Sequence, residues 1–351
     1  MLKTGIVRDS RYLEHVTSPY HPENHQRLEA IYRMLDREEM AGKFTEIPPR
    51  FATGEEIKLV HTSDYMSRVA ATADLPHSML DPDTHTSPKS YDAARLAVGG
   101  LLESIDRVMD GGIDNGFAFV RPPGHHAESN RGMGFCLFNN IAIGARYAIQ
   151  RYSLDRVLIV DWDLHHGNGT QNAFYDDPRV LYFSTHQFPY YPGSGDLNET
   201  GSGDGIGFTV NVPLSGGQGD GDYLQIFERI LIPISRQFKP QLILVSAGFD
   251  IYFQDPLGAM KVTPAGFARL TRSLLKAANE SCEGKLVFIL EGGYHLAGLE
   301  ESVKAVLKEL RGESLVPEGE TDKKDGESKY TDSQIDNIIS VLKSFWKFPM
   351  V

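Results

Sequence analysis

The feature that most constrains the fold is a series of short, uninterrupted apolar runs separated by longer amphipathic segments. Apolar runs of this kind are typical of strands buried on both faces of a parallel sheet. They lie at Phe117–Val120, Val157–Val160, Val180–Phe183, Leu242–Val245 and Leu286–Leu290. Between them, segments such as Asn139–Arg151 and Asp222–Gln237 carry apolar residues at three- and four-residue spacing, which is typical of helices. The alternation predicts an α/β fold with a single doubly wound, mostly parallel sheet and helices on both faces.

Polar residues that could bind a ligand or take part in catalysis follow four of these runs. They are His125 and His126 after Val120, Asp161, Asp163 and His165 after Val160, Asp250 after Val245, and Tyr294 after Leu290. Ligands of open parallel sheets bind beyond the carboxyl ends of the strands. We therefore expect all four sets of residues at one edge of one sheet.

The central set suggests a metal site. Asp161, Asp163 and His165 alternate along the chain, so their side chains share one face of an extended segment. Asp163, His165 and Asp250 together offer two carboxylates and one imidazole, which leave a divalent ion with an open position, as in catalytic zinc sites. The oxygen-rich set also admits Fe²⁺ or Mn²⁺. Helix capping or internal packing is the alternative for each residue taken alone.

The neighbouring residues suggest hydrolysis of an amide by an activated water, which needs a base for the water's proton and an acid for the leaving amine. His125 and His126 follow a proline-glycine turn and are the candidates for proton transfer. Asp161 could orient one ring and Asn168 the other. Tyr294, on a Gly-Gly turn, could donate a hydrogen bond to the developing oxyanion.

Composition limits the partners. The chain has 47 acidic and 35 basic residues, a net charge of −12, which disfavours phosphate backbones and favours cationic ligands. No apolar run reaches membrane-spanning length, and residues 1–10 lack the apolar stretch that is typical of a signal peptide. Its two cysteines predict neither a disulfide framework nor a thiolate cluster. We expect a cytoplasmic protein that binds neither nucleic acid nor membrane; the sequence leaves its oligomeric state open.

The chain is expected to form one domain over residues 1–351. Its core spans about residues 5–310, followed by a charged connector at 311–334 and a C-terminal helix at 335–351. Apolar residues at helical spacing between Ile335 and Trp346 favour docking of this helix on the body, with partner binding as the alternative. The glycine-rich stretches 193–195 and 201–205 lack the context of a nucleotide site and are interpreted as turns.

Several motifs resemble the histone deacetylase and acetylpolyamine amidohydrolase family over about residues 5–310. They are Pro123-Gly-His-His-Ala127, Gly134-Phe-Cys136, Asp161-Trp-Asp-Leu-His-His-Gly-Asn-Gly-Thr170, Ser246-Ala-Gly-Phe-Asp250 and Glu291-Gly-Gly-Tyr294. Asn168 and the Pro-Gly-His-His form look more like the class II branch. The resemblance implies an arginase–deacetylase fold and a zinc-dependent deacetylase that acts on acetyl-lysine in peptides or proteins, or on acetylated small amines.

The resemblance also implies residue roles. Asp163, His165 and Asp250 become zinc ligands, His126 the general base and acid, His125 an electrostatic partner paired with Asp161, and Tyr294 the oxyanion donor. In the substrate tunnel, Gly134 and Phe135 match one wall, Tyr191 matches the other, and Leu257 matches the rim. The second wall residue is usually Phe, so Tyr191 departs from the family pattern. Asp81 and Asp83 lie in a loop where some members hold the substrate backbone.

Monovalent cation sites for K⁺ or Na⁺ are implied as well. One is similar to a site built from Asp161, Asp163, His165, Ser184 and Thr185. The other would use backbone oxygens near Phe174, Asp177, Val180 and Phe208.

Three alternatives remain at this stage. A two-metal ureohydrolase on the same fold would want a carboxylate where Gly167 stands and a second Asp nearer to Asp250 than Asp255. A non-catalytic binder of acyl ligands could lack the histidines or the tyrosine, which are present here. An acetylpolyamine deacetylase would be expected to have an acidic residue where Leu257 stands.

Overall fold

The computed structural model describes residues 1–313 and 329–349. Within them the chain forms an eight-stranded sheet in the order β2-β1-β5-β10-β9-β6-β7-β8, in which every neighbouring pair is parallel. The strands are β1 (Thr4–Val7), β2 (Thr45–Glu46), β5 (Asn115–Ala118), β6 (Val157–Asp161), β7 (Val180–Gln187), β8 (Thr209–Leu214), β9 (Leu242–Ala247) and β10 (Leu286–Leu290). A separate antiparallel hairpin pairs β3 (Ser78–Asp81) with β4 (Thr84–Thr86).

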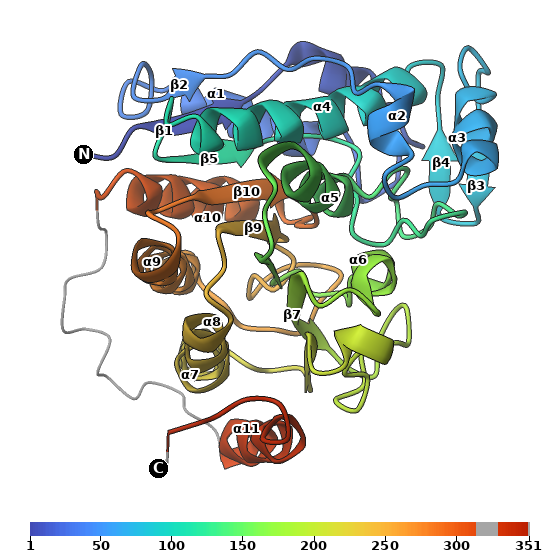
Figure 1. Ribbon diagram of the computed structural model, residues 1–351. Coiled ribbons are helices and arrows are strands. Elements are labelled where there is room, and N and C mark those ends of the chain that lie inside the picture. The colour runs from blue at the N-terminus through green and yellow to red at the C-terminus, as the bar shows by residue number, and fades with distance from the viewer. Residues whose placement is uncertain (314–328, 350–351) are drawn as a thin grey trace.

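Helices cover both faces of the sheet, with α4 and α5 on one side and α7 to α10 on the other (Figure 1). The longer helices are α1 (Gln26–Leu35), α3 (Ser63–Ala70), α4 (Ser90–Met109), α5 (Asn140–Tyr152), α9 (Pro264–Ser281), α10 (Leu296–Leu310) and α11 (Lys329–Leu342). The shorter ones are α2 (Gly54–Ile57), α6 (Asn168–Phe174), α7 (Asp220–Ile226) and α8 (Ile232–Phe238). A π-helical turn at Phe227–Leu231 joins α7 to α8, and short 3₁₀ turns lie at Ser10–Glu14 and Gly203–Gly205. The predicted doubly wound α/β fold is confirmed.

The apolar runs form the strands because both faces of the sheet are covered. Every residue of β6, β9 and β10 is buried, which explains why these runs do not alternate with polar residues. The predicted run Leu286–Leu290 matches its strand. Phe117–Val120 is displaced by two residues, because the strand proper is Asn115–Ala118 and the chain then turns toward the site.

The strand order places the functional residues. β5, β10, β9 and β6 are consecutive neighbours in the sheet, and all four run in the same direction. Their carboxyl ends therefore lie side by side at one edge. This adjacency could not be read from the chain order, in which β10 comes last.

The C-terminal segment differs in its bounds from the prediction. The helix begins at Lys329 and ends at Leu342, whereas the sequence predicted a connector up to residue 334 and a helix to residue 351. Residues 314–328 of that connector lie outside the described part of the chain. The helix docks on the body near the edge strand β8, with Ile335, Ile338 and Leu342 buried. The interpretation as a docked helix is confirmed.

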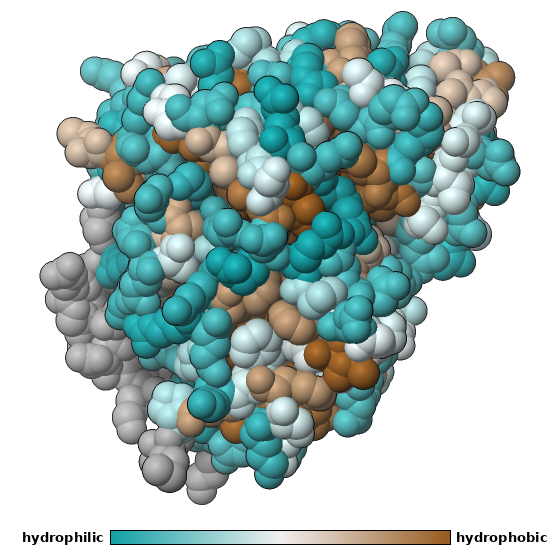
Figure 2. Space-filling model, in the orientation of Figure 1, coloured by the Kyte–Doolittle hydropathy of each residue, from teal (hydrophilic) through white to brown (hydrophobic). Residues whose placement is uncertain are grey.

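The surface view is mostly hydrophilic, with apolar residues in small scattered groups, in keeping with the acidic composition (Figure 2). None of the helices in residues 1–313 and 329–349 is both long and apolar enough to cross a membrane. The glycine-rich stretches are turns, as predicted, and Gly193, Gly195 and Gly201 have positive φ angles.

Candidate active site

Three predicted metal ligands converge at the carboxyl ends of β6 and β9. The ligand atoms of Asp163, His165 and Asp250 lie within 4.8 Å of one another, and all three residues are buried. His165 Nδ1 is 3.2 Å from Asp163 Oδ1 and 3.1 Å from Asp250 Oδ2. Ligands on a tetrahedral ion with bonds of about 2.0–2.1 Å would lie about 3.3 Å apart, so the spacing and the donor types fit zinc.

Backbone amides fix the two carboxylates. Asp250 Oδ1 accepts from the Leu164 N–H at 2.9 Å, and Asp163 Oδ2 accepts from the Gly292 N–H at 2.8 Å. Gly292 has no room for a side chain, because a Cβ atom there would lie 2.4 Å from Asp250 Oδ2 and 2.6 Å from Asp163 Oδ2. The glycine at the end of β10 therefore preserves the space that the ligands need.

The charges of the trio favour a bound cation. Burial, and then the neighbouring Asp163 carboxylate, raise the pKa of Asp250 to about 7. Burial alone would lower the pKa of His165, but Asp163 and Asp250 outweigh it and raise that pKa to about 9. Two buried carboxylates at this separation repel each other, and a divalent ion between them would relieve that repulsion.

The first histidine of the pair is held by carboxylates. His125 Nδ1 is 3.0 Å from Asp161 Oδ2, which also accepts from the Tyr182 hydroxyl at 3.1 Å. Burial lowers the pKa of His125, but Asp163, Asp161 and Glu291 outweigh burial and raise it to about 10. The predicted pairing of His125 with Asp161 is therefore present in the structure.

The second histidine is held as a neutral base. His126 Nδ1 is 2.8 Å from Asn168 Oδ1, and the Asn168 amide nitrogen donates to Glu128 Oε1 at 2.9 Å. Because Glu128 fixes the orientation of the amide, His126 Nδ1 must carry a proton and donate a hydrogen bond to Asn168 Oδ1. Burial, then His125 and His165, hold the pKa of His126 well below its ordinary value. The Nε2 atom is thus left without a proton and can accept one.

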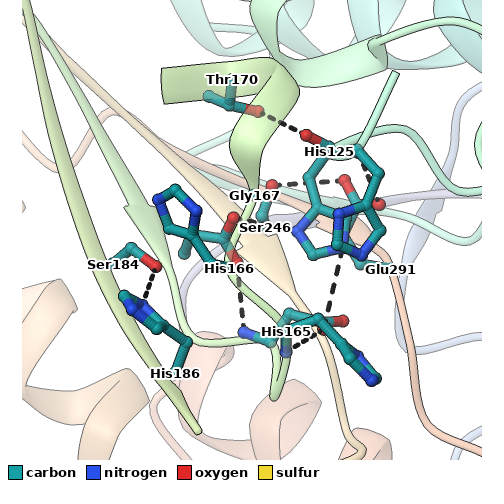
Figure 3. Close-up of polar contacts among 12 residues, drawn as sticks. His125, His165, His166, Gly167, Thr170, Ser184, His186, Ser246 and Glu291 are labelled. Carbon is teal, nitrogen blue, oxygen red and sulfur yellow. Dashed lines mark hydrogen bonds and ion pairs between the residues drawn. The ribbon is translucent and has the colours of Figure 1, made fainter. Parts of the chain in front are cut away.

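Glu291 connects three segments of the site through hydrogen bonds of its buried carboxylate. Its Oε2 accepts from the N–H groups of Gly124 and His125 at 2.7 and 3.2 Å, and its Oε1 accepts from Ser246 Oγ at 3.2 Å. These contacts bind the end of β10 to the turn after β5 and to β9, and Figure 3 shows His125, Ser246 and Glu291 grouped in this way. Burial raises the pKa of Glu291 to about 7.

Tyr294 lies on the turn that follows β10. Its ring packs edge-on to Phe135 with centroids 6.0 Å apart, and the Arg27 guanidinium lies 5.1 Å from its centroid. Burial, then the Asp250 carboxylate, raise the pKa of Tyr294 well above 10. The phenol therefore keeps its proton and remains a hydrogen-bond donor.

A narrow cavity leads to these groups. It is lined by Asp83, Pro123, His125, His126, Gly134, Phe135, His165, Tyr191, Leu257, Gly292 and Tyr294. The predicted wall residues Gly134, Phe135 and Tyr191 and the predicted rim residue Leu257 all contribute. Of the two aspartates flagged in the β3–β4 hairpin, Asp83 lines the cavity and accepts from the Gly134 N–H at 3.1 Å.

The predicted monovalent cation sites stay predictions. Ser184 pairs with Asp161 in the register of β6 and β7, and its hydroxyl is 2.9 Å from His186 Nδ1 (Figure 3). The Thr185 hydroxyl is buried without a hydrogen-bond partner. For the second site, the backbone oxygens of Phe174, Asp177 and Phe208 accept from Asp177, Val180 and Tyr182 N–H groups.

Sequence reasoning missed several residues that hold the site. Glu291 was noted only as part of a motif, although a carboxylate directly after a buried strand is itself a signal. Glu128 follows the histidine pair closely but gives no pattern of its own. Arg27 donates to the carbonyl oxygens of Glu291 and Gly293 at 2.5 and 2.7 Å and forms an ion pair with the buried Glu23. Glu23 precedes α1 and Arg27 lies in its first turn, so only their four-residue spacing could have pointed to that pair.

The sequence model of the histone deacetylase domain family matches residues 21–310. The chain is 44% identical to histone deacetylase HDA1 of Candida albicans over 346 residues, covering 89% of this chain but 41% of that protein. It is also 44% identical to histone deacetylase 15 of Arabidopsis thaliana, covering 90% of this chain and 58% of the relative. A probable deacetylase of Archaeoglobus fulgidus is 37% identical, with 98% of this chain and 99% of the relative covered.

A crystal structure of the HDA15 HD domain superposes with a TM-score of 0.91 at 40% identity, covering 98% of this chain and 95% of that chain. The chain thus spans about half the length of two of these relatives and nearly the whole of the third. The resemblance inferred from the motifs is confirmed by the matched residues and the shared fold. This chain belongs to the histone deacetylase family.

Proposed function

We propose that this protein is a zinc-dependent deacetylase that hydrolyses the acetyl amide of lysine in peptides or proteins. The observation that carries the proposal is the convergence of a buried Asp-His-Asp trio, a neutral histidine and a phenol donor around one narrow cavity. Family membership supports the same class of reaction. Fe²⁺ is compatible with the same oxygen-rich ligand set.

Asp163, His165 and Asp250 would hold the ion. A divalent ion bound there supplies a Lewis acid that activates water and polarises the amide carbonyl. His126 then acts at Nε2, where it accepts the proton of the attacking water and afterwards delivers a proton to the leaving amine. His125, kept protonated by the surrounding carboxylates, balances the negative charge that develops during the reaction.

Tyr294 donates a hydrogen bond to the carbonyl oxygen as that oxygen gains charge. The cavity between Phe135 and Tyr191 is bounded by rings, which suits the apolar methylene chain of an acyl-lysine. At the rim, Leu257 offers no charge to a distal ammonium group. Acetyl-lysine is therefore favoured over acetylated polyamines.

A comparison of kcat/KM across acetylated peptides, acetylpolyamines and longer acyl-lysines tests the proposal. We expect acetyl-lysine peptides to be hydrolysed best, with cleavage that depends on the metal. A preference for N-acetylspermidine or acetylputrescine would overturn the substrate assignment and leave the chemistry intact. The absence of turnover across the whole panel by folded, metal-loaded protein would overturn the enzymatic function and favour an acyl-ligand binder.

A further inference from the structure

A buried carboxylate outside the predicted site holds the backbone of the tyrosine turn. Asp255 Oδ2 accepts from the N–H of Tyr294 at 2.7 Å and from the N–H of His295 at 3.1 Å. Asp255 is 6% exposed. It lies in the segment between β9 and α9, so the contact joins two strand ends that are far apart in the chain.

The same carboxylate also holds the rim of the cavity. Asp255 Oδ1 accepts from the Leu257 N–H at 3.0 Å, and the Leu257 carbonyl oxygen accepts from the Tyr190 hydroxyl at 2.9 Å. Leu257 and Tyr294 both line the cavity. One side chain thus fixes the residue at the mouth and the residue that donates to the substrate.

The geometry requires a carboxylate rather than an amide. Both oxygens of Asp255 face N–H donors, and Oδ2 faces two of them. An asparagine would turn its NH₂ group toward at least one of those donors in either orientation, which leaves a buried N–H without an acceptor. With its amide oxygen toward Tyr294 and His295, an asparagine would lose only the contact with Leu257, so the change that removes all three contacts is Asp255→Ala.

Other backbone groups of the turn are held by other residues. The N–H of Gly292 donates to Asp163, the carbonyl oxygen of Gly292 accepts from Phe249, and that of Gly293 accepts from Arg27. Asp255 holds the backbone N–H groups of Tyr294 itself and of the next residue, His295. A small loss of alignment there is costly, because a displacement of about 1 Å in a reacting group can reduce the rate about 10²-fold.

We propose that Asp255 is a positioning residue, which sets the location of the Tyr294 hydroxyl and couples it to the cavity rim at Leu257. The proposal rests on the proposed function for its kinetic part. It assigns Asp255 no contact with substrate or metal. Its effect on kcat is therefore expected to pass through Tyr294, whereas its effect through Leu257 is expected on substrate binding at the rim.

A double-mutant cycle on the zinc-loaded enzyme tests this path. Asp255→Ala should lower kcat for an acetyl-lysine peptide about 10- to 100-fold at full metal content. In the Tyr294→Phe background the same change should alter kcat by no more than about twofold, because the hydroxyl it positions is gone. Asp220→Ala is the matched control: Asp220 accepts from the N–H and hydroxyl of Thr263 at the start of α9, and its loss should leave kcat unchanged.

Hydrogen exchange on the same holoenzymes gives a readout that does not need activity. The amides of Tyr294 and His295 should exchange faster in Asp255→Ala than in the unmodified protein, with strand β9 unchanged. In Asp220→Ala the faster exchange should be confined to the start of α9. This measurement also decides the matter if the kinetic arm has no turnover to report.

The outcomes separate the two proposals. Unchanged kcat in Asp255→Ala, or the same loss in both tyrosine backgrounds, overturns the positioning role and leaves the deacetylase function standing. No turnover by the unmodified holoenzyme overturns the function. In that event, unchanged exchange at Tyr294 and His295 overturns the positioning role as well, whereas faster exchange supports it.

Discussion

Replacing Gly292 with alanine should weaken metal binding by displacing two ligands at once. The added Cβ would lie 2.4 Å from Asp250 Oδ2 and 2.6 Å from Asp163 Oδ2, where ordinary contacts begin at 3.4 Å. The two oxygens must therefore retreat by about 1 Å and 0.8 Å. Metal–ligand distances tolerate only about ±0.2 Å. Zinc binding must therefore hold the two oxygens against the added Cβ, which weakens the binding.

The size of the effect follows from the packing. Relieving an overlap of this kind costs about 1–3 kcal/mol. Each 1.4 kcal/mol is about a factor of ten in an equilibrium constant, so the zinc Kd should rise about 5- to 150-fold. The backbone at Gly292 has no positive φ, which means that alanine adds no conformational strain of its own.

Competition with a chelator measures the zinc Kd directly, and thermal unfolding of the metal-free forms checks that the fold survives. Gly54→Ala is the matched control, because the nearest atom to its Cβ would be Met66 Sδ at an ordinary 3.5 Å. It should leave the Kd unchanged. An unaltered Kd in folded Gly292→Ala would refute the assignment of Asp163 and Asp250 as joint ligands.

Three further changes test the remaining roles. His126→Ala should lower kcat about 10²–10⁴-fold with little change in KM, because proton transfer acts in the transition state; near-normal kcat would mean another base. Tyr294→Phe should lower kcat about 10²–10³-fold on acetyl-lysine but less on trifluoroacetyl-lysine, whose carbonyl is more electrophilic; equal losses would contradict the donor role. Leu257→Glu should shift the ratio of kcat/KM values toward acetylpolyamines by adding a carboxylate at the rim, and an unchanged ratio would count against this role for the residue.

Much of the sheet and of the metal trio could be predicted from the sequence, for a physical reason. Strands buried on both faces must be continuously apolar, and the polar residues that follow them stand out by contrast. Asp163, His165 and Asp250 stand out in this way, and they lie together in the structure.

The supporting residues could not be predicted in the same way. Asp255 and Arg27 act on backbone groups of a turn, and a backbone N–H or carbonyl leaves no trace in the sequence. Their contacts form because β10 lies between β5 and β9 in the sheet, and this strand order cannot be predicted from the order of the strands along the chain. The bounds of the last helix were missed because charged residues at its start resemble a connector.

The most direct test is reconstitution of the metal-free protein with zinc, followed by hydrolysis of a fluorogenic acetyl-lysine peptide. We expect no turnover without metal and activity that rises to a plateau at one zinc per chain. Asp250→Asn should remain folded, bind little zinc and stay inactive. Full turnover by metal-free protein, or none by folded protein that carries one zinc per chain, would contradict the account.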